Sequence, residues 1–171
     1  METDITTAGG EADQLRAAMR AWTSGVTIVT ASYNGEQHGM TVNSFVSVSL
    51  APPIVGISLQ VSSRTYDVVR KAGAFGVTIL ETGQQPLAER FANQRASMQE
   101  RLEGLETETL KTGAPFLKGG LVYLDCRVQQ SIPAGMNTLF LAEVVAVRGG
   151  TRAAPLVYHD RAYHRLESAR A

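Results

Sequence analysis

The feature that most constrains the fold of this chain is a succession of short segments rich in β-branched residues, each closed by a turn signal. Residues 26–33, Val-Thr-Ile-Val-Thr-Ala-Ser-Tyr, run directly into Asn34-Gly35. Both positions of this dipeptide tolerate the positive φ that a two-residue hairpin turn requires. The sequence therefore predicts a strand, a tight turn and a returning strand. Pro52 and Pro53 end the stretch that follows, because proline cannot donate to a β ladder.

Further segments share this strand-like composition. Strands are expected at 54–60, 74–80, 121–130, 138–148, 156–158 and 163–166, with residues 131–135 as the connection between the two longest. Helices do not alternate regularly with these strands, which argues against a parallel doubly wound sheet. The predicted fold is mainly β, an antiparallel β-barrel with peripheral helices. Closure of such a barrel would remove its exposed sheet edges.

Three helices are expected around this sheet. The first begins near residue 13 and is amphipathic, so Met19 and Trp22 are expected to pack into the core. The second follows residues 62–65 and is closed by Gly73, and the third spans 84–92. The polar stretch that comes next, 93–110, is interpreted as a surface excursion, a peripheral helix or a mobile flap, and its role is left open.

Composition bounds the organisation of the chain. Its 171 residues, 44% of them apolar, suit one packed domain, expected over residues 11–171, with residues 1–10 as a disordered tail. Lys plus Arg number 16 and Asp plus Glu number 16, so no global basic field favours nucleic acid or a membrane surface. The lone Cys126 is expected to be an inert, packed thiol. No secretory leader or apolar run long enough to cross a bilayer is evident, so a cytoplasmic location is expected.

Several common kinds of active site are excluded by spacing. The chain has no Gly-x-Gly-x-x-Gly dinucleotide motif, no Walker phosphate loop and no Gly-x-Ser-x-Gly nucleophile elbow. No metal site is expected, because His159 and His164 lie five residues apart and far from Cys126. Strand alternation would place these two histidines on opposite faces. His38 is expected in a surface turn.

Two hydroxyl-rich stretches remain as candidate binding sites. Ser62-Ser63-Arg64-Thr65 combines hydroxyls, a positive charge and the free backbone N–H groups of a helix start, which together can hold a phosphate. The alternative is a helix cap with a surface arginine. In residues 41–49, polar side chains alternate with apolar ones in a half-buried segment, and the alternative there is a solvated sheet face.

Two longer segments carry a family resemblance. Residues 21–31, AWTSGVTIVTA, and 38–53, HGMTVNSFVSVSLAPP, resemble the short-chain flavin reductases of two-component flavin-dependent monooxygenases. Later segments agree in order: 62–65, 74–80, 87–91 and 155–166. The resemblance extends over Leu15 to Leu166, nearly the whole chain.

The resemblance implies a split β-barrel that binds FMN or FAD, usually as a homodimer with the flavin near the subunit interface. By matching position, the residues expected along the isoalloxazine ring and ribityl chain are Thr41, Val42, Asn43, Ser44, Ser47, Val48 and Ser49. Those expected at the flavin phosphate are Ser62, Ser63, Arg64 and Thr65. No residue is expected to be catalytic, because the flavin and the nicotinamide carry the chemistry.

The activity implied is that of an NAD(P)H:flavin oxidoreductase, which reduces FAD or FMN by hydride transfer and supplies diffusible reduced flavin to a partner monooxygenase. No arginine cluster announces a 2′-phosphate site, which favours NADH over NADPH, although Arg95, Arg101 and Arg161 are left without a role. Asn137, Tyr163 and His164 are the candidates for the nicotinamide side.

One departure from the family pattern keeps alternatives open. These reductases commonly carry Gly-Asp-His between the last two long strands, where this chain has Gly135-Met136-Asn137. Asparagine still donates and accepts hydrogen bonds, but it cannot titrate. The alternatives are a flavoenzyme of the oxidase or oxygenase type and a non-catalytic flavin carrier, and an interaction-only protein is least favoured.

Overall fold

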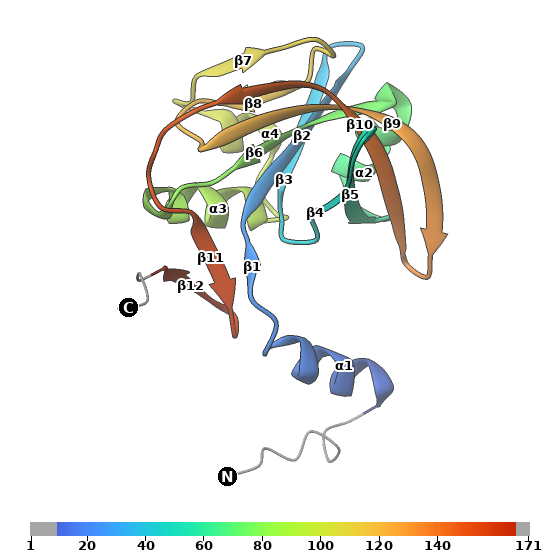
Figure 1. The fold of residues 1–171 in the computed structure, drawn as a ribbon, viewed down its shortest axis with the longest axis vertical. Coiled ribbons are helices and arrows are strands. Elements are labelled where there is room, and N and C mark those ends of the chain that lie inside the picture. The colour runs from blue at the N-terminus through green and yellow to red at the C-terminus, as the bar shows by residue number, and fades with distance from the viewer. Residues whose placement is uncertain (1–9, 167–171) are drawn as a thin grey trace.

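The computed structural model describes residues 10–166 and is built around the hairpin that the sequence predicts (Figure 1). Strand β2 (Thr27–Tyr33) pairs antiparallel with β3 (Glu36–Val42). Asn34 and Gly35 both adopt a positive φ, of 48° and 82°. The turn therefore forms for the reason expected. Residues 1–9 of the predicted tail lie outside the described residues.

The strands form one large antiparallel sheet of seven strands, in the order β3-β2-β6-β9-β10-β5-β4. Its other members are β4 (Val46–Leu50), β5 (Pro53–Gln60), β6 (Ala74–Ile79), β9 (Val122–Ala134) and β10 (Asn137–Gly149). The mainly β, barrel-like fold is confirmed. The expected closure is not found, because β3 and β4 end the sheet without pairing to each other. The barrel is split, with two edges.

The prediction that residues 131–135 form a loop is wrong. Strands β9 and β10 continue through this segment and are joined only by Gly135 and Met136, with Gly135 at a φ of 60°. Pro133 is tolerated inside β9 although it has no N–H to donate. The result is a long hairpin whose residues 129–137 are all exposed.

A small sheet lies below the barrel in Figure 1, made of β1 (Ser24–Gly25), β11 (Leu156–His159) and β12 (Ala162–Arg165). The prediction that His159 and His164 lie on opposite faces is wrong. The chain reverses at Asp160-Arg161, so the two histidines come from paired strands and their ring centroids are 5.9 Å apart. A further pair, β7 (Thr107–Thr109) and β8 (Pro115–Leu117), forms the other small sheet.

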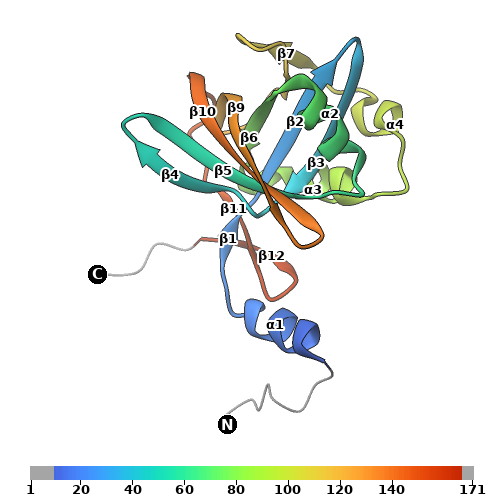
Figure 2. The same ribbon diagram turned by 90° about the vertical axis from the view of Figure 1, so that its right-hand side faces the viewer.

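The helices are α1 (Glu11–Met19), α2 (Arg64–Ala72), α3 (Gln85–Ala92) and α4 (Met98–Leu102), with one 3-10 turn at Thr82–Gln84. No helix among residues 10–166 is long and apolar enough to cross a membrane. Helix α2 ends at Gly73, which has a φ of 63°, as its sequence predicts. Figure 2 shows α2, α3 and α4 gathered beside β3.

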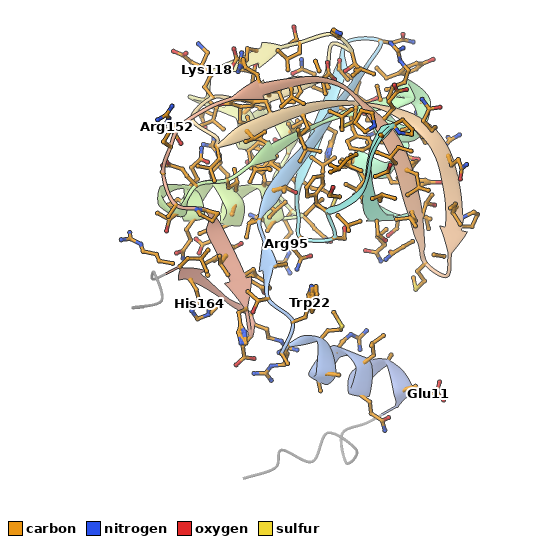
Figure 3. All side chains as sticks on the ribbon, viewed as in Figure 1. Glu11, Trp22, Arg95, Lys118, Arg152 and His164 are labelled. Carbon is orange, nitrogen blue, oxygen red and sulfur yellow. The ribbon has the colours of Figure 1, made fainter. Side chains whose placement is uncertain are left out.

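Helix α1 corrects the expectation that its apolar face packs into the core. It stands apart from the barrel in Figure 1, and Met19 and Trp22 are 51% and 68% exposed. Figure 3 shows Trp22 between this helix and the barrel. The amphipathic pattern predicts the helix correctly, but among the described residues nothing covers its apolar side chains, Leu15 and Met19.

The core consists of two clusters of buried side chains. One lies within the barrel and includes Ile57, Phe75 and Phe140, and the other includes Ile28 and Phe91 under α3. Cys126 belongs to the first cluster and is fully buried, as expected for a packed thiol. Burial raises the pKa of its thiol to about 12, with a smaller contribution from the neighbouring Asp125. The thiol is therefore protonated and unreactive at neutral pH.

Candidate functional site

Residues of β3, of the start of α2, of the end of α3 and of α4 line a cavity of about 490 Å³. These elements lie together in Figure 2. The lining residues of the cavity come from four segments of the chain, 38–41, 60–65, 91–96 and α4. The lining side chains are His38, Met40, Thr41, Gln60, Ser62, Ser63, Arg64, Thr65, Phe91, Ala92, Gln94, Ala96 and Arg101. The structure thus brings the predicted phosphate residues together with Thr41, from the other hydroxyl-rich stretch.

The start of α2 supplies the polar floor of this cavity. Ser63 caps the helix by accepting a hydrogen bond from the backbone N–H of Tyr66, at 3.2 Å. Arg64 is exposed and pairs with Glu36 at 2.7 Å. Thr65 is buried, and its hydroxyl lies 2.8 Å from Nδ1 of His38. Hydroxyls and a guanidinium therefore surround a helix N-terminus, an arrangement suited to an anion.

His38 is not in a surface turn, as was expected, but in the middle of β3 and half-buried against the cavity. Its pKa is lowered chiefly by burial, and further by the positive charges of Arg101 and Arg64, while Glu36 opposes the shift. The imidazole is consequently neutral at pH 7. Its hydrogen bond to Thr65 fixes the ring against the start of α2.

The stretch Thr41–Ser44 continues from β3 along the cavity wall. Thr41 donates its hydroxyl proton to the carbonyl of Ala88 at 2.6 Å, whereas the side chain of Val42 is buried in the core. Asn43 is exposed. The hydroxyl of Ser44 donates to the carbonyl oxygen of Ser58 and accepts from its N–H. Thr41 and Asn43 therefore line the cavities of this region, whereas Val42 lines neither of the two described here.

A second cavity, of about 190 Å³, shares Thr41 and Ala92 with the first. Its other lining residues are Val26, Asn43, Tyr158 and Tyr163. The two tyrosine rings are in edge contact, with centroids 5.2 Å apart. This cavity therefore offers flat aromatic and polar surfaces next to the first cavity, whose floor is suited to an anion such as phosphate.

Other predicted site residues are not brought to these cavities. Ser47, Val48 and Ser49 lie on β4, at the opposite end of the sheet from β3. His164 is exposed, and its Nε2 lies 3.2 Å from the carbonyl oxygen of His159. Figure 3 shows it on β12, outside the barrel.

Asn137 lies at the tip of the long hairpin, away from Tyr163. It is exposed and pairs in register with Gln60, a residue of the first cavity. The carbonyl of Met136 accepts a hydrogen bond from the N–H of Val61 at 3.0 Å. The hairpin tip therefore adjoins the mouth of the first cavity, so the nicotinamide-side candidates are divided between two places.

Arg101 is one of the three arginines to which the sequence assigns no role, and it lines the first cavity. It is only 4% exposed and lies in α4, within the stretch interpreted as a surface excursion. A signal was available in the sequence, because Ser97 and Glu100 have the spacing of a capping box and form one. That motif marks the start of α4, but nothing in it predicts that the arginine turns inward.

The residues present fit the phosphate end of a flavin. Buried polar groups are normally paired, yet Nε of the buried Arg101 has no hydrogen-bond partner among the described residues. The α2 N-terminus and the hydroxyls of Ser62, Ser63 and Thr65 face the same cavity. A phosphate ester is anionic and accepts several hydrogen bonds, so it matches the positive charge of Arg101 and its unpartnered Nε.

Comparison with known proteins points in the same direction. Residues 19–167 match the model of the flavin reductase like domain. The reductase component of 4-hydroxyphenylacetate 3-monooxygenase from Thermus thermophilus is 34% identical, over 90% of this chain and 96% of the relative. Actinorhodin polyketide dimerase from Streptomyces coelicolor is 37% identical, over 92% and 89%. The NADH:FAD oxidoreductase SgcE6 of Streptomyces globisporus, solved with NAD and FAD fragments, superposes with a TM-score of 0.84 at 29% identity, covering 92% of this chain and 94% of that one.

Proposed function

Because the chain belongs to the flavin reductase like domain family, we propose that it is an NADH:flavin oxidoreductase, which reduces FAD or FMN and releases the reduced flavin to a partner monooxygenase. The observation that carries this proposal is the first cavity, where the α2 N-terminus, its hydroxyls and Arg101 meet Thr41. That combination is suited to a phosphate-bearing ligand whose ring extends towards Asn43.

The bound flavin would accept a hydride from the nicotinamide, and the protein's own contribution is to bind and orient both. Ser62, Ser63, Arg64 and Thr65 hold the phosphate of the flavin. Thr41, Asn43 and the backbone at Val42 border its ring and ribityl chain. No side chain here is proposed as a proton donor or acceptor, since hydride transfer requires none.

The nicotinamide side is proposed in two parts. Tyr163, with Tyr158, offers a flat surface in the second cavity, and Asn137 offers an amide at the mouth of the first. His164 was a further candidate, but its exposed position on β12 gives it no part in either cavity. Ser47, Val48 and Ser49 would reach the flavin only from the β4 side, so their role depends on what covers that edge.

The cellular setting belongs to the same proposal. Residues 11–171 act as a single flavin reductase-like domain in the cytoplasm, where NADH is available and the reduced flavin can diffuse to its oxygenase. NADH is favoured over NADPH because the two arginines that line the first cavity, Arg64 and Arg101, are assigned to the flavin phosphate, and the residues that line the second cavity include no arginine for a 2′-phosphate.

We further propose that the functional unit is a homodimer. Strand β4 ends the sheet, and Val46, Val48 and Leu50 on it are 50%, 50% and 88% exposed. An exposed edge carrying large apolar side chains tends to pair with another chain. A second copy that covers this edge would also bring Ser47 and Ser49 into an enclosed surface.

A second candidate function has two observations in its favour. The relative with 37% identity is named a polyketide dimerase rather than a reductase, and this chain carries Met136-Asn137 where reductases of the family commonly have Asp-His. In that case the protein would be a flavoenzyme that acts on an organic substrate of its own. It would bind flavin without needing to oxidise NADH rapidly.

The deciding experiment is NADH oxidation by the purified protein, with FAD, with FMN and without added flavin, repeated with NADPH. The proposal predicts turnover that requires added flavin and no organic substrate, and is faster with NADH. Flavin binding without oxidation of either nicotinamide would reject the reductase and favour the second candidate.

A further inference from the structure

A third cavity, of about 250 Å³, is lined by side chains from residues 16–22, at and after the end of α1, and from residues 158–161, at the turn between β11 and β12. Asn43 and Tyr158 line both this cavity and the second one. The second cavity shares Thr41 and Ala92 with the first. The three cavities therefore follow one another in a row, and the proposed function leaves the third without a ligand.

The end of α1 is fixed to the turn that forms the other wall. Arg20 donates from Nε to the carboxylate of Asp160, and the N–H of Asp160 donates to the carbonyl of Arg20 at 3.2 Å. Beyond the helix, the N–H of Trp22 donates to the carbonyl of Met19 at 3.1 Å. Figure 3 shows Trp22 at this junction. The walls of the third cavity are therefore joined by hydrogen bonds, although α1 stands apart from the barrel.

The charges around this cavity do not balance. Three of its lining residues are arginines, and two of them are paired: Arg16 with Asp13, and Arg20 with Asp160. The third, Arg161, is exposed and makes no ion pair within residues 10–166. One guanidinium is therefore free to receive one negative charge from a ligand.

Arg161 occupies a backbone position that favours glycine. The turn at Asp160-Arg161 joins two antiparallel strands, as Asn34-Gly35 does, and both of its residues have a positive φ, of 47° and 64°. Asn34-Gly35 has nearly the same geometry with glycine at the second position, at a φ of 82°. A side chain at such a position is strained, and strain of this kind is concentrated at functional sites. The fold therefore does not explain the arginine, whereas a ligand for its guanidinium does.

The remaining walls are apolar and aromatic. Trp22 and Met19 are 68% and 51% exposed, and Tyr158 contributes a second aromatic ring. Flat aromatic side chains bind flat apolar groups, and a cavity of this size is smaller than those that hold drug-sized ligands. A single free guanidinium is matched in charge and shape by one carboxylate, because its planar fork can donate two parallel hydrogen bonds. A phosphate dianion would require a second unpaired cation.

We propose that the third cavity binds a small aromatic carboxylate, with its carboxylate on Arg161 and its ring against Trp22 and Tyr158. This site goes beyond the proposed function, because binding there requires neither flavin nor nicotinamide. If the flavin ring extends towards Asn43, as the proposed function has it, the bound acid lies beside that ring. Only this last relation rests on the proposed function.

Trp22 provides a direct readout, since it is the one tryptophan of the chain and lines the cavity. Its fluorescence is followed during titration of the flavin-free protein with phenylacetate, with 2-phenylethanol, which has the ring without the charge, and with acetate, which has the charge without the ring. Phenylacetate should shift the emission to shorter wavelength in a saturable way. The other two probes should bind at least about tenfold more weakly, because each lacks one of the two contacts.

The variants are Arg161→Gly, Arg161→Lys and the matched control Arg152→Gly. Arg152 is exposed, lines none of the three cavities and has no positive φ. Arg161→Gly should weaken phenylacetate binding by roughly tenfold to a hundredfold, the range of a lost charge-assisted hydrogen bond, and should raise the melting temperature because it relieves the strained turn. Arg161→Lys should retain part of the affinity, and Arg152→Gly all of it.

Four results would overturn the inference. Equal affinity for phenylacetate and 2-phenylethanol would mean that the cavity selects no charge. Unchanged affinity in Arg161→Gly would mean that this guanidinium does not bind the acid. A stronger response to inorganic phosphate than to phenylacetate would identify a phosphate site. Emission from Trp22 that depends on protein concentration and not on phenylacetate would show that a second copy fills the cavity. NADH oxidation is measured separately, so failure of this site leaves the reductase proposal standing, and failure of the reductase leaves this site standing.

Discussion

The two edges of the large sheet are finished in opposite ways. The β3 edge is covered by α2, α3 and α4, and the carbonyl of Gly39 in β3 accepts a hydrogen bond from Arg101 of α4. The β4 edge, on the far side of Figure 2, ends in Leu50, which is 88% exposed. Since an uncovered edge invites pairing, each edge needs a partner. At β3 that partner is the chain itself, and the cover encloses a cavity. At β4 we propose that it is a second copy.

The largest expected effect is the loss of stability when a buried side chain of α3, which covers the β3 edge, is truncated. Phe91 is 1% exposed and lies between the cavity and the second core cluster. Phe91→Ala should lower the free energy of unfolding by about 3–5 kcal/mol, because it leaves a void. Urea denaturation measures this. A loss that depended on protein concentration would contradict the assignment of Phe91 to the core of one chain.

The next prediction concerns association through the β4 edge. Leu50→Asp should weaken dimerisation by at least about tenfold, since a charge would have to be buried in an apolar interface. Light scattering across a dilution series measures the change. The matched control is Val147→Asp, which alters another exposed apolar residue, 65% exposed, on β10. If both variants remain as dimeric as the wild type, the proposed interface is wrong.

A smaller effect is expected at the helix start that forms the floor of the cavity. Ser63→Ala removes the cap of α2 and should cost about 1 kcal/mol of stability. Ser62→Ala is the control, because Ser62 is exposed and does not cap the helix. It should change stability by less than about 0.5 kcal/mol. If Ser62→Ala destabilises the protein more than Ser63→Ala, the cap has been misassigned.

The smallest expected effect is a dependence of stability on pH that comes from His38. Its folded pKa lies below the ordinary value of 6.5, so between the two values the unfolded state binds the proton and the folded state does not. Stability should therefore fall as the pH is lowered from 6.5 through the folded pKa. His38→Gln should flatten the profile in this window by up to about one proton. An unchanged profile would contradict the shift.

Much of the fold follows from local chemistry that a single sequence displays. Asn34-Gly35, the cap at Ser63 and the stop at Gly73 each act on their immediate neighbours, so their turns and helix ends were predicted correctly. The long hairpin was not, because Pro133 suggested a loop and only pairing with β10 keeps it in a strand. Register across strands is a tertiary property that local composition does not display.

The candidate site was predictable only where its residues are contiguous. The cluster at 62–65 was found because a helix start gathers its own donors. The position of Arg101 was not predicted, because the direction of its side chain depends on a contact with Gly39, 62 residues earlier in the chain. The prediction that Met19 and Trp22 pack into the core was wrong for a related reason. An amphipathic pattern predicts that an apolar face is covered, but it does not say by which chain.

Hydrogen exchange with and without FMN tests most directly whether the flavin phosphate binds at the covered β3 edge. Binding of FMN at this edge should slow exchange in residues 38–41, 62–66 and 93–102, and Arg101→Gln should lose the protection of the last segment. Protection at 47–49 as well would show that β4 contributes to the ring site. If FMN binds without protecting any of these three segments, the phosphate does not bind at the β3 edge.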